Sequence, residues 1–118
     1  MRNLFLVPCI GWFAFAPLTA SAHAFLVKAD PPVGSVVRPM TTVTLEFSEA
    51  IELALSGAEL SRGAGGDEPL MLVFTDESHR RVMGKVPLLM AGSYRVKWHV
   101  VSADTHRTEG SFTFTVRQ

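Results

Sequence analysis

The sequence predicts an all-β domain, a two-sheet sandwich of about seven short strands. From His23 onward, no segment keeps the i, i+3, i+4, i+7 apolar spacing of an amphipathic helix over a helix length. Apolar and polar residues instead alternate with period two in several places, which is typical of strands with one buried face. Segments rich in Gly, Pro and Asp separate these strands and predict turns.

Three alternating segments carry the strongest strand signal, and four others are weaker. Tyr94, at the start of a strong segment, resembles a tyrosine corner, in which the hydroxyl bonds back to nearby backbone. The weaker segments are 25–28, 57–60, 70–75 and 81–86. The residues expected to face inward in the strong segments are Val43, Leu45 and Phe47, then Tyr94, Val96, Trp98 and Val100, and finally Phe112, Phe114 and Val116.

Length and charge restrict the classes of function. The 118 residues, of which 47% are hydrophobic, are enough for one small domain. Lysine and arginine together number 11, as do aspartate and glutamate, and no polybasic run is present. This balance argues against nucleic-acid binding. The glycine-rich segment 61–68 lacks the strand–loop–helix context of a phosphate-binding loop, so we interpret it as a flexible connection.

Residues 1–22 are predicted to form a cleaved secretory signal peptide. Arg2 gives a positive start, residues 4–16 are almost wholly apolar, and the segment ends in the small-x-small pattern Ala20-Ser21-Ala22. The apolar run is shorter than the roughly 20 residues of a membrane-spanning helix. Cleavage after Ala22 leaves residues 23–118 as the mature domain, whereas cleavage after Ala24 is an alternative that would remove His23.

The only cysteine, Cys9, is lost with the signal peptide. We expect no lipid anchor at Cys9, because it lies too early and follows the bulky Pro8. The mature chain then has no thiol for disulfides, thiolate–zinc sites, iron–sulfur clusters or a His₂Cys copper site.

Cleavage after Ala22 would place a histidine at the new N-terminus. The α-amine and ring Nδ1 of His23 can then chelate one metal ion without ordering any loop. Asp104 and His106 stand two residues apart after a predicted strand, where i and i+2 share a face in extended backbone. One amine, two imidazoles and a carboxylate favour Cu(II) over Zn(II). The alternative is that Asp104-Thr105-His106 forms a solvated, capped turn.

The remaining histidines and methionines have simpler interpretations. His79 lies in a polar turn and His99 on the outward phase of its strand, so both are expected to be solvated. The mature methionines are scattered, and Met71 and Met90, beside apolar residues, are expected to fill the core.

Read in order, the mature chain resembles the CopC (PcoC-like) family of periplasmic copper-resistance proteins. The resemblance runs from His23 to about Val116. Single blocks are weak, but their order along the chain is specific. The blocks are the terminal His23, Asp30-Pro31-Pro32-Val33-Gly34-Ser35, Val43-Thr44-Leu45-Glu46-Phe47-Ser48-Glu49, Ser56-Gly57-Ala58-Glu59-Leu60, Leu89-Met90-Ala91-Gly92-Ser93-Tyr94-Arg95-Val96-Lys97-Trp98, Val100-Val101-Ser102-Ala103-Asp104-Thr105-His106 and Gly110-Ser111-Phe112-Thr113-Phe114.

The resemblance implies a Greek-key β-sandwich or barrel, cupredoxin-like or Ig-like, that binds one Cu(II) in the periplasm. The implied ligands are His23, Asp104 and His106. Glu49 matches a family glutamate near the metal, as an axial ligand or just outside the ligand set, although it also fits a surface carboxylate at a strand end. Family members with a Cu(I) site carry a dense methionine cluster, which this chain lacks, so no Cu(I) site is expected.

The function implied is copper resistance or homeostasis without catalysis, by sequestering copper or delivering it to an inner-membrane copper transporter of the CopD type. One alternative is a copper mono-oxygenase with a terminal-histidine brace, whose metal needs open positions for O₂. Asp104 would occupy one of these positions. Another alternative is a metal-free Ig-like adhesion or scaffold domain.

Overall fold

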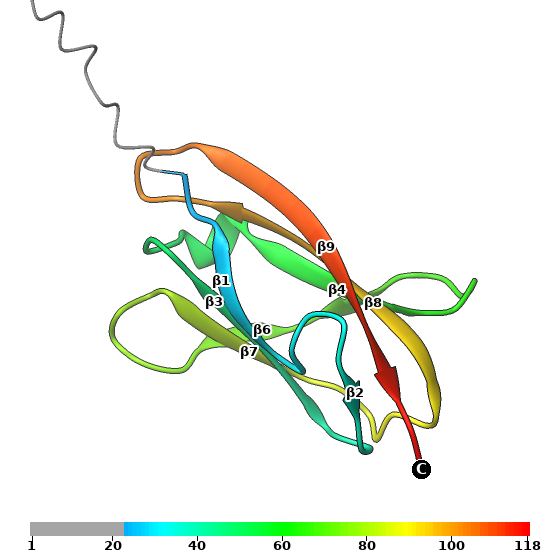
Figure 1. The fold of residues 1–118 in the computed structure, drawn as a ribbon. Helices are drawn as coiled ribbons and strands as arrows, with labels where there is room; N and C mark the ends of the chain where they lie inside the picture. Colours follow the sequence, from blue (N-terminus) through cyan, green and yellow to red (C-terminus); the bar gives the residue numbers. More distant parts are fainter. Residues whose placement is uncertain (1–22) are drawn as a thin grey trace, which may run out of the picture.

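The computed structural model describes residues 23–118 (Figure 1). The predicted signal peptide and Cys9 lie outside the described residues. The prediction of an all-β sandwich is confirmed, and one short 3₁₀ turn, η1, interrupts the strands. The elements are β1 (Leu26–Asp30), β2 (Val36–Val37), β3 (Thr42–Phe47), η1 (Leu53–Leu55), β4 (Gly57–Arg62), β5 (Glu68–Leu70), β6 (Leu72–Phe74), β7 (Arg81–Lys85), β8 (Gly92–Val101) and β9 (Arg107–Val116).

The strands form two sheets. One sheet has the order β1-β3-β7-β6 and the other β2-β9-β8-β4-β5. Neighbouring strands are antiparallel except for β2, which pairs in parallel with β9. The longest ladder joins β8 to β9, each of ten residues, and it runs along one side of the molecule in Figure 1. Within residues 23–118, no helix has the length and apolar composition needed to cross a membrane.

The described part of the chain has nine strands rather than about seven. Strand β2 has two residues, too few for an alternating pattern. The segment 70–75, expected to be one strand, is divided at Met71, because Leu70 ends β5 in one sheet and Leu72 begins β6 in the other. A crossing between sheets leaves the alternation of apolar residues intact, so the sequence pattern did not reveal it.

The core contains the inward-facing residues of both sheets, as the alternation predicted. Phe47, Phe114 and Leu45 are among its largest fully buried side chains. Tyr94 is 4% exposed, and its hydroxyl donates a hydrogen bond of 2.7 Å to the carbonyl oxygen of Met90. The expected core position of Tyr94 is therefore confirmed, and its hydroxyl also makes the backbone bond of a tyrosine corner.

The prediction that Met71 and Met90 fill the core is wrong. The two residues are 85% and 56% exposed. Met71 stands at the crossing between the sheets, where it lines a shallow surface hollow with Val73, Met83 and Lys85. An apolar neighbour in sequence is therefore a weak indicator of burial at a strand boundary.

Gly110 makes room for the indole of Trp98, its partner on the neighbouring strand. A Cβ at Gly110 would lie 2.6 Å from Cζ2 of Trp98. The indole is restrained because it packs edge-on against Phe47, with ring centroids 5.3 Å apart. The close approach therefore requires glycine at this position.

We predict that Gly110→Ala destabilises the domain by about 1–3 kcal/mol, because the added methyl group overpacks the indole. Thermal unfolding followed by circular dichroism measures this as a lower Tm. The matched control is Gly66→Ala, where no atom lies within 4 Å of the added Cβ. Equal Tm values for the two variants would show that Trp98 shifts freely.

Candidate metal-binding site

His23 lies beside the turn between β8 and β9, although the two segments are far apart in the sequence. The ring centroids of His23 and His106 are 4.6 Å apart, and the ring planes are tilted by 55°. Figure 1 shows the start of the described chain next to this turn. The fold therefore brings together the two histidines that the sequence singled out.

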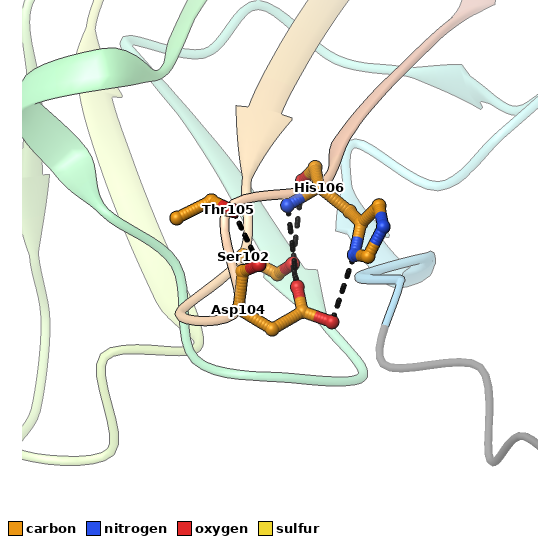
Figure 2. Close-up of polar contacts among 4 residues, drawn as sticks. All are labelled: Ser102, Asp104, Thr105 and His106. Carbon is orange, nitrogen blue, oxygen red and sulfur yellow. Dashed lines mark hydrogen bonds and ion pairs between the residues drawn. The ribbon is translucent and has the colours of Figure 1, made fainter.

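The turn itself is tightly bonded. The backbone N–H of Ser102 donates to the carbonyl oxygen of His106 at 2.9 Å, and the N–H of Thr105 donates to the carbonyl oxygen of Ser102 at 2.8 Å. Thr105 has a φ of 73°, a left-handed conformation that is uncommon for a β-branched residue. This reversal returns the chain to β9, and both the Asp104 and His106 side chains lie on one side of it (Figure 2).

A second segment supports the turn from behind. Ile51 forms an isolated antiparallel bridge with Ser102, and Ala103 N–H donates to the carbonyl oxygen of Ala50 at 3.3 Å. Glu52 N–H donates to the carbonyl oxygen of Val101 at 2.8 Å. The turn is therefore held by long-range backbone contacts as well as by its own hydrogen bonds.

The carboxylate of Asp104 accepts hydrogen bonds at both oxygens. Oδ1 accepts from the hydroxyl of Ser102, which is 1% exposed, and from the backbone N–H of His106 at 3.2 Å. Oδ2 lies 2.9 Å from Nδ1 of His106 (Figure 2). The Ser102 hydroxyl first, and then His106, lower the pKa of Asp104 from 3.8 to about 2. Asp104 is therefore an anion throughout the neutral range.

The three predicted ligand residues His23, Asp104 and His106 are neighbours, but they are not arranged as a finished metal site. Within residues 23–118, no three His, Cys, Asp or Glu side chains form a group ready to hold a metal ion. In the described chain, Asp104 and His106 instead bond to each other. A cation bound by both the carboxylate and Nδ1 of His106 would replace that hydrogen bond, whereas Nε2 of His106 takes no part in it.

The other candidates lie elsewhere. Glu49 is exposed just after β3, and the contacts among His23, Asp104 and His106 in the described residues do not include it. His79 is exposed, as expected, and stacks on Phe74 with ring centroids 4.3 Å apart. His99 faces outward as expected but is half-buried, because its ring lies over Gly57.

Sequence reasoning missed the hydroxyl residues that hold the ligand candidates. Ser102 bonds Asp104, Thr108 bonds the carbonyl oxygen of Ala24, and Ser48 bonds the backbone N–H of Phe25. Ser102 had a local signal, since a serine two residues before an aspartate in a turn often bonds within the turn. Thr108 and Ser48 had none, because their partners are distant in sequence.

The CopC domain family matches residues 26–117. The chain belongs to the CopC family. It is 34% identical over 116 residues to the protein YobA of Escherichia coli K12, covering 89% of this chain and 93% of YobA. It is also 33% identical over 108 residues to copper resistance protein C of Escherichia coli, covering 84% of this chain and 85% of that protein.

Solved structures of the CopC family share the fold. The crystal structure of CopC from Methylosinus trichosporium OB3b matches with a TM-score of 0.72 and 32% identity, covering 80% of this chain and 93% of that one. The structure of PcoC, a methionine-rich copper resistance protein from Escherichia coli, matches with a TM-score of 0.70 and 32% identity, covering 80% and 99%. The expected membership of a copper-binding resistance family is thus confirmed.

Removing the Ser102 hydroxyl is predicted to raise the pKa of Asp104 from about 2 toward 3.8, since this hydrogen bond is the largest cause of the shift. A carboxyl group with a depressed pKa in the folded state stabilises the fold above its unfolded pKa, and this contribution disappears as the pH falls through the folded pKa. In Ser102→Ala, the contribution of the Asp104 carboxylate to the stability of the fold should therefore be smaller, and it should disappear at a higher pH than in the parent chain. Carboxyl NMR titration of metal-free protein measures the midpoint, with exposed Ser111→Ala as control, and an unchanged midpoint in Ser102→Ala would contradict the assignment.

Proposed function

We propose that the chain, after removal of residues 1–22, is a periplasmic protein that binds one Cu(II) ion in copper resistance or homeostasis. The ligands are the α-amine and Nδ1 of His23, the imidazole of His106 and the carboxylate of Asp104. The observation that carries the proposal is the approach of the His23 and His106 rings to 4.6 Å, next to the Asp104 carboxylate. Membership of the CopC family supports copper as the ligand.

The separation of the two rings suits a shared ion. A metal bound by an imidazole nitrogen lies about 2 Å from it, so neighbouring rings can reach one ion after small rotations. Amine, imidazole and carboxylate donors in a tetragonal set suit Cu(II), which also heads the affinity order of divalent metals. The ionised state of Asp104 supports its part in this set, because the carboxylate carries no proton for the metal to displace.

The proposal requires cleavage before His23. In the full chain the nitrogen of His23 belongs to a peptide bond, and only cleavage converts it into a chelating amine. Ala24 is completely buried in the core. Cleavage after Ala24 would remove this core residue together with His23, which supports Ala22 as the last residue of the signal peptide.

We propose Cu(II) as the only copper ion bound. Met71 and Met83 line one hollow, but a pair of thioethers is less than the dense methionine cluster that Cu(I) favours.

Glu49 remains in the proposal as a carboxylate near the metal, either an axial ligand or just outside the ligand set. It is exposed and follows Ser48, which contacts the N-terminal segment.

The copper is proposed to pass to an inner-membrane transporter of the CopD type. The copper transport protein CutJ of Bacillus subtilis is 28% identical to this chain over 118 residues, and the match covers 98% of this chain but 22% of CutJ. A domain similar to this one is therefore part of a longer protein named for copper transport. That arrangement supports delivery to a transporter over simple storage.

Binding without catalysis is proposed over mono-oxygenase chemistry. Activation of O₂ needs open positions on the metal, and the Asp104 carboxylate beside the two rings would occupy one of them. A metal-free adhesion domain would leave the approach of the two histidines without a use.

We expect His23→Ala and His106→Ala each to weaken Cu(II) binding by orders of magnitude, because a nitrogen lost from a small chelate cannot be replaced by a distant imidazole. Competition titration of the processed protein against a chelator of known affinity measures the loss. His79→Ala is the matched control, since His79 is exposed and stacks on Phe74.

The amine is tested separately by acetylating the α-amine of a chain that begins at His23. The acetylated chain keeps both imidazoles and the carboxylate but has no free amine. Its Cu(II) affinity should fall well below that of the unacetylated chain. If all these chains bound Cu(II) equally, the proposed ligand set would be wrong.

Copper affinity is also predicted to fall as the pH decreases from about 8 to 5, because protons compete with the metal for amine and imidazole nitrogens. Asp104, with a pKa of about 2, stays ionised over this range, so the decrease should come from the nitrogen ligands alone. Competition titrations at several pH values measure it. A constant affinity would rule out nitrogen ligands.

A further inference from the structure

The segment that carries His23 is held before the first strand by one buried side chain and three hydrogen bonds. The side chain of Ala24 is completely buried, and its carbonyl oxygen accepts a hydrogen bond of 2.7 Å from Oγ1 of Thr108. The backbone N–H of Phe25 donates to Oγ of Ser48 at 2.8 Å, and the N–H of Ser48 donates to the carbonyl oxygen of Phe25 at 2.8 Å. Chain ends without such contacts are usually poorly ordered.

These contacts come from both sheets. Thr108 lies in β9 of the five-stranded sheet, next to the turn that holds His106. Ser48 follows directly after β3 of the four-stranded sheet. The N-terminal segment is thus bonded to both layers of the sandwich, and the contact from Thr108 fixes its position relative to the turn.

The two hydroxyl groups hold a part of the chain that the strand ladders do not reach. β1 begins at Leu26, whose partner across the ladder is Phe47, so His23 and Ala24 lie beyond the ladder between β1 and β3. Thr108 donates to the carbonyl oxygen of the peptide group between Ala24 and Phe25, and the N–H of that same group donates to Oγ of Ser48. Both hydroxyls therefore fix one peptide group, which lies one residue after His23.

We propose that Thr108 and Ser48 are positioning residues for Cu(II) binding, holding His23 beside His106 before the metal arrives. This inference rests on the proposed function. Without the two hydroxyls, His23 would still chelate Cu(II) through its amine and ring. The loss of conformational entropy on ordering the N-terminal segment would then reduce the free energy of Cu(II) binding. With both hydroxyl contacts present, the segment is already ordered when the domain folds.

Thr108→Val tests the first contact, because valine keeps the shape of threonine but has no hydroxyl. Loss of one hydrogen bond from the prearranged site should weaken Cu(II) binding about twofold to tenfold. Thr108→Ser keeps the hydroxyl and should restore affinity to nearly that of the parent chain. Thr113→Val, at an exposed position further along β9, is the matched control.

Ser48→Ala tests the second contact by the same comparison. Its backbone N–H still donates to Phe25, so its effect should be smaller than the effect of Thr108→Val. The double variant should weaken binding further. All chains begin at His23, and affinities are measured by competition titration well below the Tm of the least stable variant.

Two further measurements separate positioning from general stability. Hydrogen exchange of the Phe25 amide in metal-free protein should be faster in Thr108→Val and Ser48→Ala than in Thr113→Val. The electron paramagnetic resonance spectrum of saturated Cu(II) protein should stay unchanged, because the ligands are the same. A weaker affinity with faster exchange and an unchanged spectrum supports the proposal.

Equal Cu(II) affinity in Thr108→Val, Thr108→Ser and the parent would overturn the positioning role. A loss in Thr108→Val that Thr108→Ser does not reverse would also overturn it, since the hydroxyl would then not be the cause. His23→Ala and His106→Ala are measured in the same series. If they bind Cu(II) like the parent, the proposed function itself fails, which is distinguishable from failure of the positioning role alone.

Discussion

The antiparallel ladder between β8 and β9 is the feature on which the rest of the site depends. Its register pairs Gly92 with Val116 at one end and Val101 with Arg107 at the other. The chain between Val101 and Arg107 must therefore reverse within a few residues, and the turn with Thr105 in a left-handed conformation accomplishes this. The same register makes Thr108 the second residue of β9, opposite Val100. A register shift of one residue would exchange the two faces of β9 and move Thr108 away from Ala24.

The bond between Asp104 and His106 gives the metal-free chain a defined state. Two groups suited to a cation are held 2.9 Å apart by a hydrogen bond, while their side chains stay 60% exposed for His106 and 35% exposed for Asp104. The Ser102 hydroxyl and the backbone N–H of His106 add two further hydrogen bonds to the carboxylate. In the proposed site, two of the three ligand residues, Asp104 and His106, are thus already gathered on one turn before copper arrives.

The four histidines of the sequence have different surroundings, and these surroundings distinguish His23 and His106 from the other two. His79 stacks on Phe74, and its carbonyl oxygen accepts a hydrogen bond from the N–H of Ile51. Ile51 in turn pairs with Ser102 in the turn between β8 and β9. His99 covers Gly57 on the outer face of the five-stranded sheet. Among the described residues, the two histidine rings in contact with each other are those of His23 and His106.

Asp104 and His106 were expected to share a face of extended backbone, but they lie in a turn. The sequence by itself determined the strands with clear alternation, their inward faces and the core position of Tyr94. These features depend on neighbours within a few residues, so local spacing contains them. Only the tertiary structure decided the division at Met71, the exposure of Met71 and Met90, and the places of Thr108 and Ser48. The approach of His23 to His106 was expected from the family resemblance and from donor chemistry, but its geometry required the packed sandwich. Contacts between distant segments depend on the registers of both sheets together, and no short stretch of sequence records them.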